Sequence, residues 1–312
     1  MLSFPGTRTD DTMANTDTIR KAVIPVAGPG TRLLPATKSQ PKEMLPVGRK
    51  PTVQYVVEEL AQAGITQVLF VTGRKKSSIE DHFDRDPELE RRLAETGEGL
   101  RQELETSSGV SFFYTRQSVQ AGNADAVRQA QDFVGDEPFV VAFGDTIIKS
   151  DGRQSLLQRM VHAHAQSGAA CTLAVEEVPE EDVFRYGVVE PAAGSDPSSE
   201  TMKLAGLVEK PEKAAAPSNL AIAPRYVFNR AIFDAIDATL PGRGGELWLT
   251  DSIGLLIKRG LDVRAMKLTE SERRYDIGTF ETYFKAFIDF ALSDDRYGYT
   301  IRQYLVWKAD QI

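Results

Sequence analysis

Short apolar runs alternate with amphipathic stretches along the first half of the chain. The apolar runs have the length of buried strands and lie at 21–27, 66–72, 110–115 and 138–143. The stretches between them carry apolar residues at helical spacing and lie at 52–64, 77–84, 87–105 and 122–133. Strands that alternate with helices in this way predict an α/β fold, with a Rossmann-like, mainly parallel mixed sheet flanked by helices.

The second half of the chain has a different pattern. After a predicted helix at 152–167, four runs of strand character follow one another with little helix between them, at 171–178, 185–191, 203–211 and 220–228. This order predicts an antiparallel portion added to the sheet, with an exposed hairpin tip at 191–201. Helices are then expected at 229–239 and 247–259, a strand at 262–268, and helical segments from 280 onward.

The ends of the chain differ from its middle. Residues 1–19 are polar and aperiodic, which predicts a disordered extension. We expect 20–295 to form one domain and 296–312 a helical segment whose apolar side chains contact another subunit. The aromatic residues just before that segment, at 283, 284, 287 and 290, are expected to form the buried face of a core helix.

Composition narrows the class of protein. The 312 residues are 41% hydrophobic, and 37 basic against 45 acidic side chains give a net charge of −8. Such an acidic chain does not suit nucleic acid, and no apolar run approaches the roughly 20 residues that a membrane span needs. A single cysteine, Cys171, favours a reducing, cytoplasmic compartment. With three histidines at no metal-ligand spacing, the chemistry is expected to depend on oxygen ligands, backbone amides and Lys or Arg.

A glycine loop follows the first predicted strand. It reads Gly28-Pro29-Gly30-Thr31-Arg32, and Lys42 follows ten residues later. The loop lacks the Walker A string, and Leu33 stands where a dinucleotide-binding loop needs its third glycine. Glycine backbone amides, an Arg and a Lys in one short stretch can nevertheless converge on a polyphosphate.

The stretch KAVIPVAGPGTRLLPATKSQPKEMLPVGRKPTVQYVVEELAQAGI (21–65) closely resembles the N-terminal signature of sugar-nucleotide pyrophosphorylases. Within that superfamily it is most similar to the bacterial UTP–glucose-1-phosphate uridylyltransferases. The resemblance runs from about Arg20 to Ala291 and includes RQ (116–117), RYGVVE (185–190), VEKP (208–211) and GGELWLTDSI (244–253). It implies a nucleotidyltransferase fold for 20–295, whose antiparallel portion binds the sugar.

The implied reaction joins UTP and glucose 1-phosphate to give UDP-glucose and pyrophosphate. The sugar phosphate is already ionised at neutral pH and attacks the α-phosphorus in line, so positioning and charge neutralisation are needed rather than a base. By resemblance, Arg32 would hold the β- and γ-phosphates and Lys42 would neutralise charge at the α-phosphorus. Asp145, after the strand PFVVAF, would bind Mg²⁺, although a turn aspartate is the other interpretation. Asp276 would be a second metal ligand or a sugar contact.

The resemblance also places the base and the sugar. Gln117 and the backbone of Ala27 and Gly28 would meet the uracil, and Gly122 would pass beneath the nucleoside where a Cβ would collide. Glu209 would accept hydrogen bonds from sugar hydroxyls, Lys210 would hold the 1-phosphate, and Gly187 would offer a backbone N–H. The remaining nucleotide contacts would be Gly30, Thr31 and Glu43. The expected partners are these small molecules and further copies of the chain, as a dimer or tetramer, with no nucleic acid and no membrane.

Several alternatives stay open at this point. Phe143-Gly144 precedes Asp145 where the uridylyl branch usually has Leu-Pro, and a glycine there is typical of the thymidylyl branch. Thymidylyl transfer, another sugar 1-phosphate, or a catalytically silent nucleotide-sugar binding protein are therefore the alternatives. A nicotinamide-dependent oxidoreductase is disfavoured because the second strand ends in Thr72-Gly73-Arg74, without the acidic residue that would bind the ribose.

Overall fold

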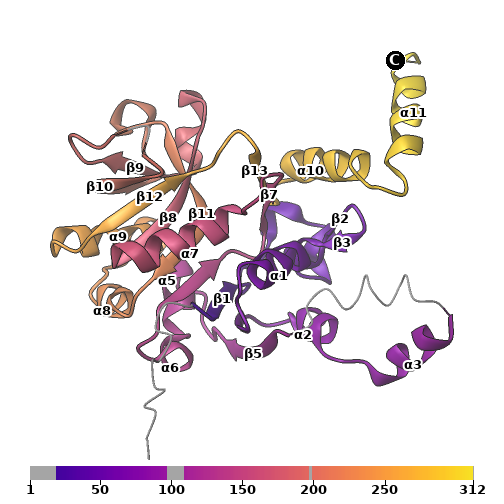
Figure 1. Cartoon of the computed structure of the whole chain (residues 1–312), viewed down its shortest axis with the longest axis horizontal. Coiled ribbons are helices and arrows are strands. Elements are labelled where there is room, and N and C mark those ends of the chain that lie inside the picture. Colours follow the sequence, from indigo (N-terminus) through magenta and orange to yellow (C-terminus); the bar gives the residue numbers. More distant parts are fainter. Residues whose placement is uncertain (1–18, 97–108, 197–198, 312) are drawn as a thin grey trace, which may run out of the picture.

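A computed structural model describes residues 19–96, 109–196 and 199–311. Its centre is a nine-stranded mixed sheet with helices on both faces (Figure 1), as the alternating pattern predicts. The strand order is β5 (Ser111–Arg116), β4 (Gln67–Thr72), β1 (Lys21–Pro25), β6 (Phe139–Ala142), β11 (Leu220–Phe228), β8 (Cys171–Glu177), β12 (Val263–Lys267), β10 (Thr201–Glu209) and β9 (Gly187–Pro191).

The two halves of the sheet differ in strand direction. The first four strands in this order are parallel to one another. From β11 onward the pairs are antiparallel, except that β12 runs parallel to β8. Strand β9 pairs with β10 and also meets β11, where Val188 lies opposite Ala221. The antiparallel portion expected from the second half of the chain is therefore present, and its strands curl round one end of the sheet.

Two layers of helices bury the faces of the sheet. Neighbouring residues of β6 show the alternation: Val140 packs toward one layer and Val141 toward the other. One layer consists of α1 (Thr52–Gln62), α2 (Ser77–Phe83) and α7 (Leu156–Ser167). The other consists of α5 (Asn123–Arg128), α6 (Gln131–Val134), α8 (Ala231–Asp237) and α9 (Leu249–Lys258). The buried thiol of Cys171 lies in this second core, as expected of an inert residue.

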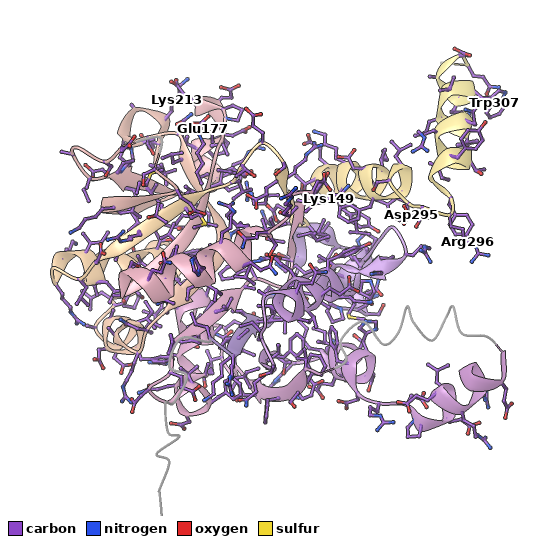
Figure 2. All side chains as sticks on the ribbon, viewed as in Figure 1. Lys149, Glu177, Lys213, Asp295, Arg296 and Trp307 are labelled. Carbon is purple, nitrogen blue, oxygen red and sulfur yellow. The ribbon has the colours of Figure 1, made fainter. Side chains whose placement is uncertain are left out.

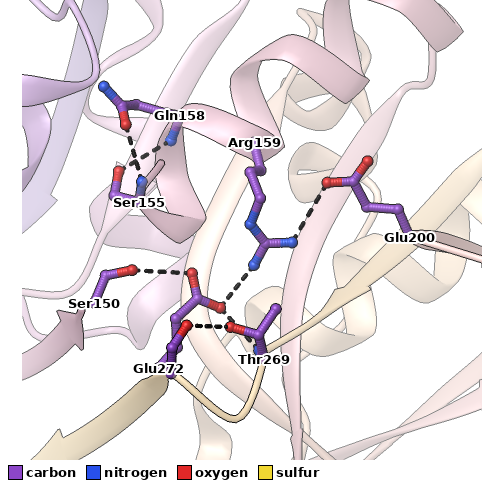
Figure 3. A network of polar contacts seen from close by, with 8 residues as sticks. Ser150, Ser155, Gln158, Arg159, Glu200, Thr269 and Glu272 are labelled. Atoms are coloured by element: carbon purple, nitrogen blue, oxygen red, sulfur yellow. Dashed lines mark hydrogen bonds and ion pairs between the residues drawn. The ribbon is translucent and has the colours of Figure 1, made fainter. Parts of the chain in front are cut away.

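A two-stranded ladder, which the sequence pattern did not indicate, stands beside the main sheet. It pairs β7 (Thr146–Ser150) with β13 (Glu272–Asp276), so that Ser150 lies opposite Glu272 and Thr146 opposite Asp276. Figure 3 shows what fixes its far end: the Glu272 carboxylate accepts hydrogen bonds from Ser150 Oγ at 3.1 Å and Arg159 Nη2 at 2.6 Å. At its near end, Arg225 Nη2 donates to the Thr146 carbonyl at 2.8 Å. Both ends of β7 are thus held by side-chain hydrogen bonds, of which the one from Arg225 is buried.

The C-terminal helices lie apart from this core. Helix α10 (Phe280–Leu292) packs Tyr283 and Phe290 onto a small cluster that includes Val47 of the short strand β2 (Pro46–Val47), which pairs with β3 (Lys50–Pro51). The expectation of one buried aromatic face is wrong for Phe284 and Phe287, which are 55% and 39% exposed. Their stripe is turned about a quarter of a helical turn from the stripe that meets the body.

Helix α11 (Gly298–Ala309) projects beyond the body (Figure 1), and Trp307 points away from it (Figure 2). Helix α3 (Pro87–Thr96) agrees with the first part of the helix predicted at 87–105. The rest of that helix and residues 1–18 of the predicted extension lie outside the described residues. Within the described part of the chain, no helix has the length and apolar character needed to cross a bilayer.

Candidate active site

A cavity of about 490 Å³ opens where the carboxyl ends of β1 and β6 meet the antiparallel half of the sheet. This is the edge at which α/β sheets bind ligands. Most of the predicted site residues line it: Ala27, Gly28, Arg32, Lys42, Glu43, Gln117, Gly122, Asp145, Gly187, Glu209, Lys210 and Asp276. The remaining two, Gly30 and Thr31, line a smaller cavity of about 150 Å³ that shares Arg32 and Lys42 with the first.

Lys42 and Asp145 form an ion pair on the floor of the cavity. The Lys42 ammonium also lies beside the glycine loop, because a Cβ at Gly28 would be 3.8 Å from Nζ. Burial alone would lower the pKa of Lys42, but attraction to Asp145, Glu43 and Asp276 outweighs it and holds the pKa above its usual value. Lys42 is therefore a fixed positive charge rather than a proton donor.

The two aspartates meet through the β7–β13 ladder. Because Asp276 lies opposite Thr146, the Ile277 N–H donates to the Asp145 carbonyl at 2.9 Å. Burial, together with the charge of Asp145, raises the pKa of Asp276, whereas Lys42 draws the pKa of Asp145 below its usual value. The two carboxylates thus influence each other's pKa and lie close to Lys42.

Arg32 reaches the same point from the glycine loop. A Cβ at Gly278 would lie 3.1 Å from Arg32 Nη2 and 3.0 Å from Asp276 Oδ1, so both groups lie against this glycine. Gly30 has a φ of +67°, which turns the chain two residues before Arg32, and its carbonyl accepts a hydrogen bond from Thr37 Oγ1 at 2.8 Å. The loop thus directs a guanidinium toward the carboxylate pair.

Glu43 lines the cavity, but its carboxylate is engaged by another side chain. Its side chain is 2% exposed and accepts a hydrogen bond from Lys76 Nζ at 2.7 Å. An ionised pair buried this far is costly to break, so the Glu43 carboxylate is committed to Lys76. The pair fixes the turn that carries the neighbouring Lys42.

The part of the cavity predicted to bind the sugar combines hydrogen-bonding and charged groups. The Glu209 carboxylate accepts a hydrogen bond from Thr250 Oγ1 at 2.7 Å and lies 3.2 Å from Lys210 Nζ. Gly187 lines the same wall, where a Cβ would lie 3.1 Å from both Glu209 Oε2 and Thr250 Oγ1. A side chain at position 187 would therefore narrow this end of the cavity.

Lys210 is held in an unusual geometry. Its φ of +45° is rare for a residue with a side chain, and its N–H donates to the Tyr186 carbonyl at 3.0 Å. Its ammonium lies 4.1 Å from the centre of the Trp248 ring, a cation–π contact. Positive-φ backbone at a non-glycine residue is common at ligand sites, where neighbouring contacts compensate for the strain.

The part of the cavity predicted to bind the base is built from the segment after β5. Gln120 Nε2 donates to the Ala27 carbonyl at 2.7 Å, and Gln117 Nε2 donates to the Gly122 carbonyl at 3.0 Å. Gly122 has a φ of +109°, and a Cβ there would lie 2.3 Å from the carbonyl oxygen of Leu247. Position 122 thus requires glycine because of the protein backbone, in addition to any nucleoside bound above it.

The cavity also contains residues that were not predicted for it, among them Gln120 and Arg274. Arg274 lies two residues before Asp276 on β13, so strand alternation puts both on one face, but the strand itself was not predicted. Its guanidinium pairs with Glu176 and lies 4.4 Å from the Tyr186 ring. Trp248, which belongs to the motif at 244–253, also lines the cavity.

Comparison with known proteins gives a consistent result. The family model described as "Nucleotidyl transferase" matches residues 21–292. A Staphylococcus saprophyticus protein named UTP–glucose-1-phosphate uridylyltransferase 2 is 43% identical over 279 residues, which cover 89% of this chain and 93% of that protein.

Solved structures agree with the sequence relatives. The UTP-bound UGPase from Acinetobacter baumannii superposes with a TM-score of 0.82 at 36% identity, over 92% of this chain and 99% of that one. A UDP-glucose pyrophosphorylase complexed with UDP-glucose superposes with a TM-score of 0.79 at 34% identity, over 87% of this chain and 98% of that one.

Proposed function

The chain belongs to the nucleotidyl transferase family, and on that premise we propose that it transfers a uridylyl group from UTP to glucose 1-phosphate, forming UDP-glucose and pyrophosphate. The observation that carries the proposal is the cavity itself. Arg32, Lys42 and a pair of aspartates line it together with Glu209 and Lys210. Relatives named for this reaction, and structures solved with UTP or UDP-glucose, support the choice of substrates.

The chemical step is a displacement at the α-phosphorus of UTP. An ionised oxygen of glucose 1-phosphate forms the new P–O bond, and the bond to the β-phosphate oxygen breaks, so that pyrophosphate leaves with the electron pair. No proton has to be removed from the nucleophile. The main barrier is repulsion between two polyanions, which positive groups in a buried site can lower.

The cationic side chains divide this work. Lys42, held by Asp145 beside Gly28, neutralises charge at the α-phosphate. Arg32 binds the β- and γ-phosphates, because a planar guanidinium forms two parallel hydrogen bonds to a phosphate. The loop that contains Gly28, Gly30 and Thr31 lines the two cavities and offers its backbone amides to the same phosphates.

The other end of the cavity binds the sugar phosphate. Lys210 pairs with the 1-phosphate, and Trp248 and Glu209 hold the ammonium in place before the substrate arrives. Glu209 and Gly187 then face the sugar hydroxyls. Gln117, Ala27 and Gly122 line the base end, where the uracil is expected.

Asp145 and Asp276 fit a divalent cation, and we propose Mg²⁺. Their carboxylates supply the hard oxygen donors that such a cation prefers. Burial and the charge of Asp145 raise the pKa of Asp276, and a bound cation would relieve this repulsion between the two carboxylates. Among the described residues no group of three or more His, Cys, Asp or Glu could hold a metal alone. Two carboxylates completed by substrate phosphates are the usual way in which proteins bind Mg²⁺. When bound, the ion neutralises phosphate charge and orients the triphosphate.

The proposal extends to the organisation of the chain. We propose that 20–295 act as one nucleotidyltransferase domain in the cytoplasm, with 296–312 as a contact in a dimer or tetramer. Exposed apolar side chains on α10 and α11 support the contact: Phe284, Ile288, Tyr304, Val306 and Trp307. Light scattering of the full chain and of a chain ending at 295 tests this contact. The shorter chain should form an assembly with fewer subunits than the full chain.

A pyrophosphate-release assay with Mg²⁺ tests the reaction by combining UTP or dTTP with glucose 1-phosphate or galactose 1-phosphate. Strong preference for UTP with glucose 1-phosphate is expected. Preference for dTTP or for galactose 1-phosphate would keep the reaction class and reject the substrates. No pyrophosphate with any pair would favour a silent binding protein.

A further inference from the structure

The side-chain amide of Gln117 has only one orientation that its surroundings accept. Its nitrogen carries two hydrogens and has two acceptors, the Gly122 carbonyl at 3.0 Å and Asp125 Oδ2 at 2.7 Å. A backbone carbonyl cannot donate, and neither can an ionised carboxylate. An amide turned the other way would place its oxygen against both of these oxygens.

Arg128 keeps Asp125 an acceptor. Its guanidinium donates to Asp125 Oδ1, the carboxylate oxygen that Gln117 does not use. Both members of the Gln117–Asp125 contact are buried, with exposed fractions of 5% and 4%. Hydrogen bonds to a buried charged group are strong and costly to leave unmade. The contacts from Arg128 and Gln117 to Asp125 therefore fix the orientations of these side chains.

This arrangement determines which atom of Gln117 remains for a ligand. With both amide hydrogens used, the carbonyl oxygen Oε1 is the polar atom left to face the cavity that Gln117 lines. Within the described part of the chain, Oε1 has no hydrogen-bond donor. The base end of the cavity therefore presents an acceptor that requires a donor from the ligand.

We propose that Asp125 is a specificity-determining residue that acts by positioning Gln117, and this inference rests on the proposed function. By holding both amide hydrogens, Asp125 and the Gly122 carbonyl present Gln117 Oε1 to the base. A base with a ring imide N–H, uracil or thymine, supplies the donor. Cytosine has a lone pair on the equivalent ring nitrogen, so two acceptors would face each other and CTP is rejected.

Asp125→Asn tests the role of the carboxylate. Arg128 would hold the Asn oxygen, so the Asn amide would point its hydrogens at Gln117 and favour the flipped orientation. We expect the wild-type chain to prefer UTP over CTP by at least about 100-fold in kcat/KM, and Asp125→Asn to reduce this ratio by at least about 10-fold. A smaller change in a variant that melts as the wild type does would overturn the proposal.

Arg128 supplies a matched control. Arg128→Met leaves the carboxylate in place, so the UTP to CTP ratio should stay as in the wild type. In the double variant Asp125→Asn/Arg128→Met, the Asn is free to turn its oxygen toward Gln117, and the ratio should recover toward the wild-type value. A merely structural role for Asp125 predicts the opposite order, with the double variant more impaired than either single one.

A second test uses the wild-type chain alone and does not depend on a variant that folds. UTP methylated on the imide nitrogen has no N–H to donate, so its kcat/KM should fall by at least about 100-fold, as for CTP. Turnover of the methylated nucleotide near that of UTP would overturn the inference and leave the proposed function standing. Failure of UTP itself would instead reject the proposed function.

Discussion

The backbone N–H of Ile277 donates to the backbone carbonyl of Asp145 at 2.9 Å, and this bond joins two segments that lie 132 residues apart in the sequence. It extends the β7–β13 ladder by one step beyond the Thr146–Asp276 pair. The position of Asp276 relative to Asp145 therefore depends on the register of that ladder. A slip of one residue would turn Asp276 to the other face.

The contacts of Glu272 are expected to fix this register. Its carboxylate is 1% exposed and pairs with Arg159, which is 14% exposed (Figure 3). Glu272→Gln would leave the Arg159 guanidinium with only the more exposed carboxylate of Glu200, and the free energy of unfolding should fall by roughly 2 kcal/mol. Urea unfolding measures this loss of stability. Lys213→Ala is the control, because Lys213 lies on the surface (Figure 2) and its exposed ion pair with Glu180 should contribute little to the free energy of unfolding. Equal stability of Glu272→Gln and wild type would reject the role.

Lys42 and Asp145 are expected to act in the chemical step. Lys42→Ala removes the charge at the α-phosphate, and Asp145→Asn removes both the ion-pair partner and a metal ligand. Each should lower kcat by more than about 100-fold, or about 2.7 kcal/mol, with the fold intact. Initial rates at saturating substrates and thermal melting provide the measurement and its control. Near-normal turnover in either variant would be incompatible with the assigned role.

Lys210 is expected to contribute mainly to binding. Lys210→Ala should raise the KM for glucose 1-phosphate at least about 10-fold and leave the KM for UTP unchanged. Trp248→Leu removes the cation–π contact and should raise the same KM roughly 3-fold, whereas Trp248→Phe keeps an aromatic face and should have less effect. An unchanged KM for the sugar phosphate in Lys210→Ala would mean that Lys210 is only a surface residue.

His164 makes folding depend on pH. Burial lowers its pKa from 6.5 to about 4, and its Nδ1 lies 3.0 Å from Thr172 Oγ1. Between these values the unfolded chain binds a proton that the folded chain does not, so stability falls as the pH drops from 6.5 toward 4. The slope should be up to about 1.4 kcal/mol per pH unit.

Urea unfolding across that pH range measures the effect. His164→Gln should remove this share of the slope, and His162→Gln, on an exposed residue of the same helix, should not. Identical slopes in wild type and His164→Gln would show that His164 does not contribute.

The sequence predicts the parallel half of the sheet well because strands buried on both faces are continuous apolar runs. The strands β7 and β13 were missed because TIIKS and ERRYD mix charged and apolar residues, and one face of the ladder borders the cavity. Short strands of this kind are defined by pairing with a distant partner, which local pattern does not report.

The candidate site was predicted residue by residue from the family signature, and the structure adds what neighbouring groups do. Glu43 was expected to bind nucleotide, but its carboxylate pairs with Lys76. Gly122 needs its glycine because of the Leu247 backbone, 125 residues later in the chain. Asp125 was not singled out at all, because only the packed structure shows that both Gln117 and Arg128 contact it.

Oxygen labelling tests the central claim most directly. Glucose 1-phosphate carrying ¹⁸O in its phosphate is incubated with unlabelled UTP and Mg²⁺, and the products are analysed by ³¹P NMR. Attack by the sugar phosphate on the α-phosphorus predicts labelled UDP-glucose, with ¹⁸O in the bridge between its two phosphorus atoms, and unlabelled pyrophosphate. Label in the pyrophosphate, or an unlabelled bridge in UDP-glucose, would contradict the account.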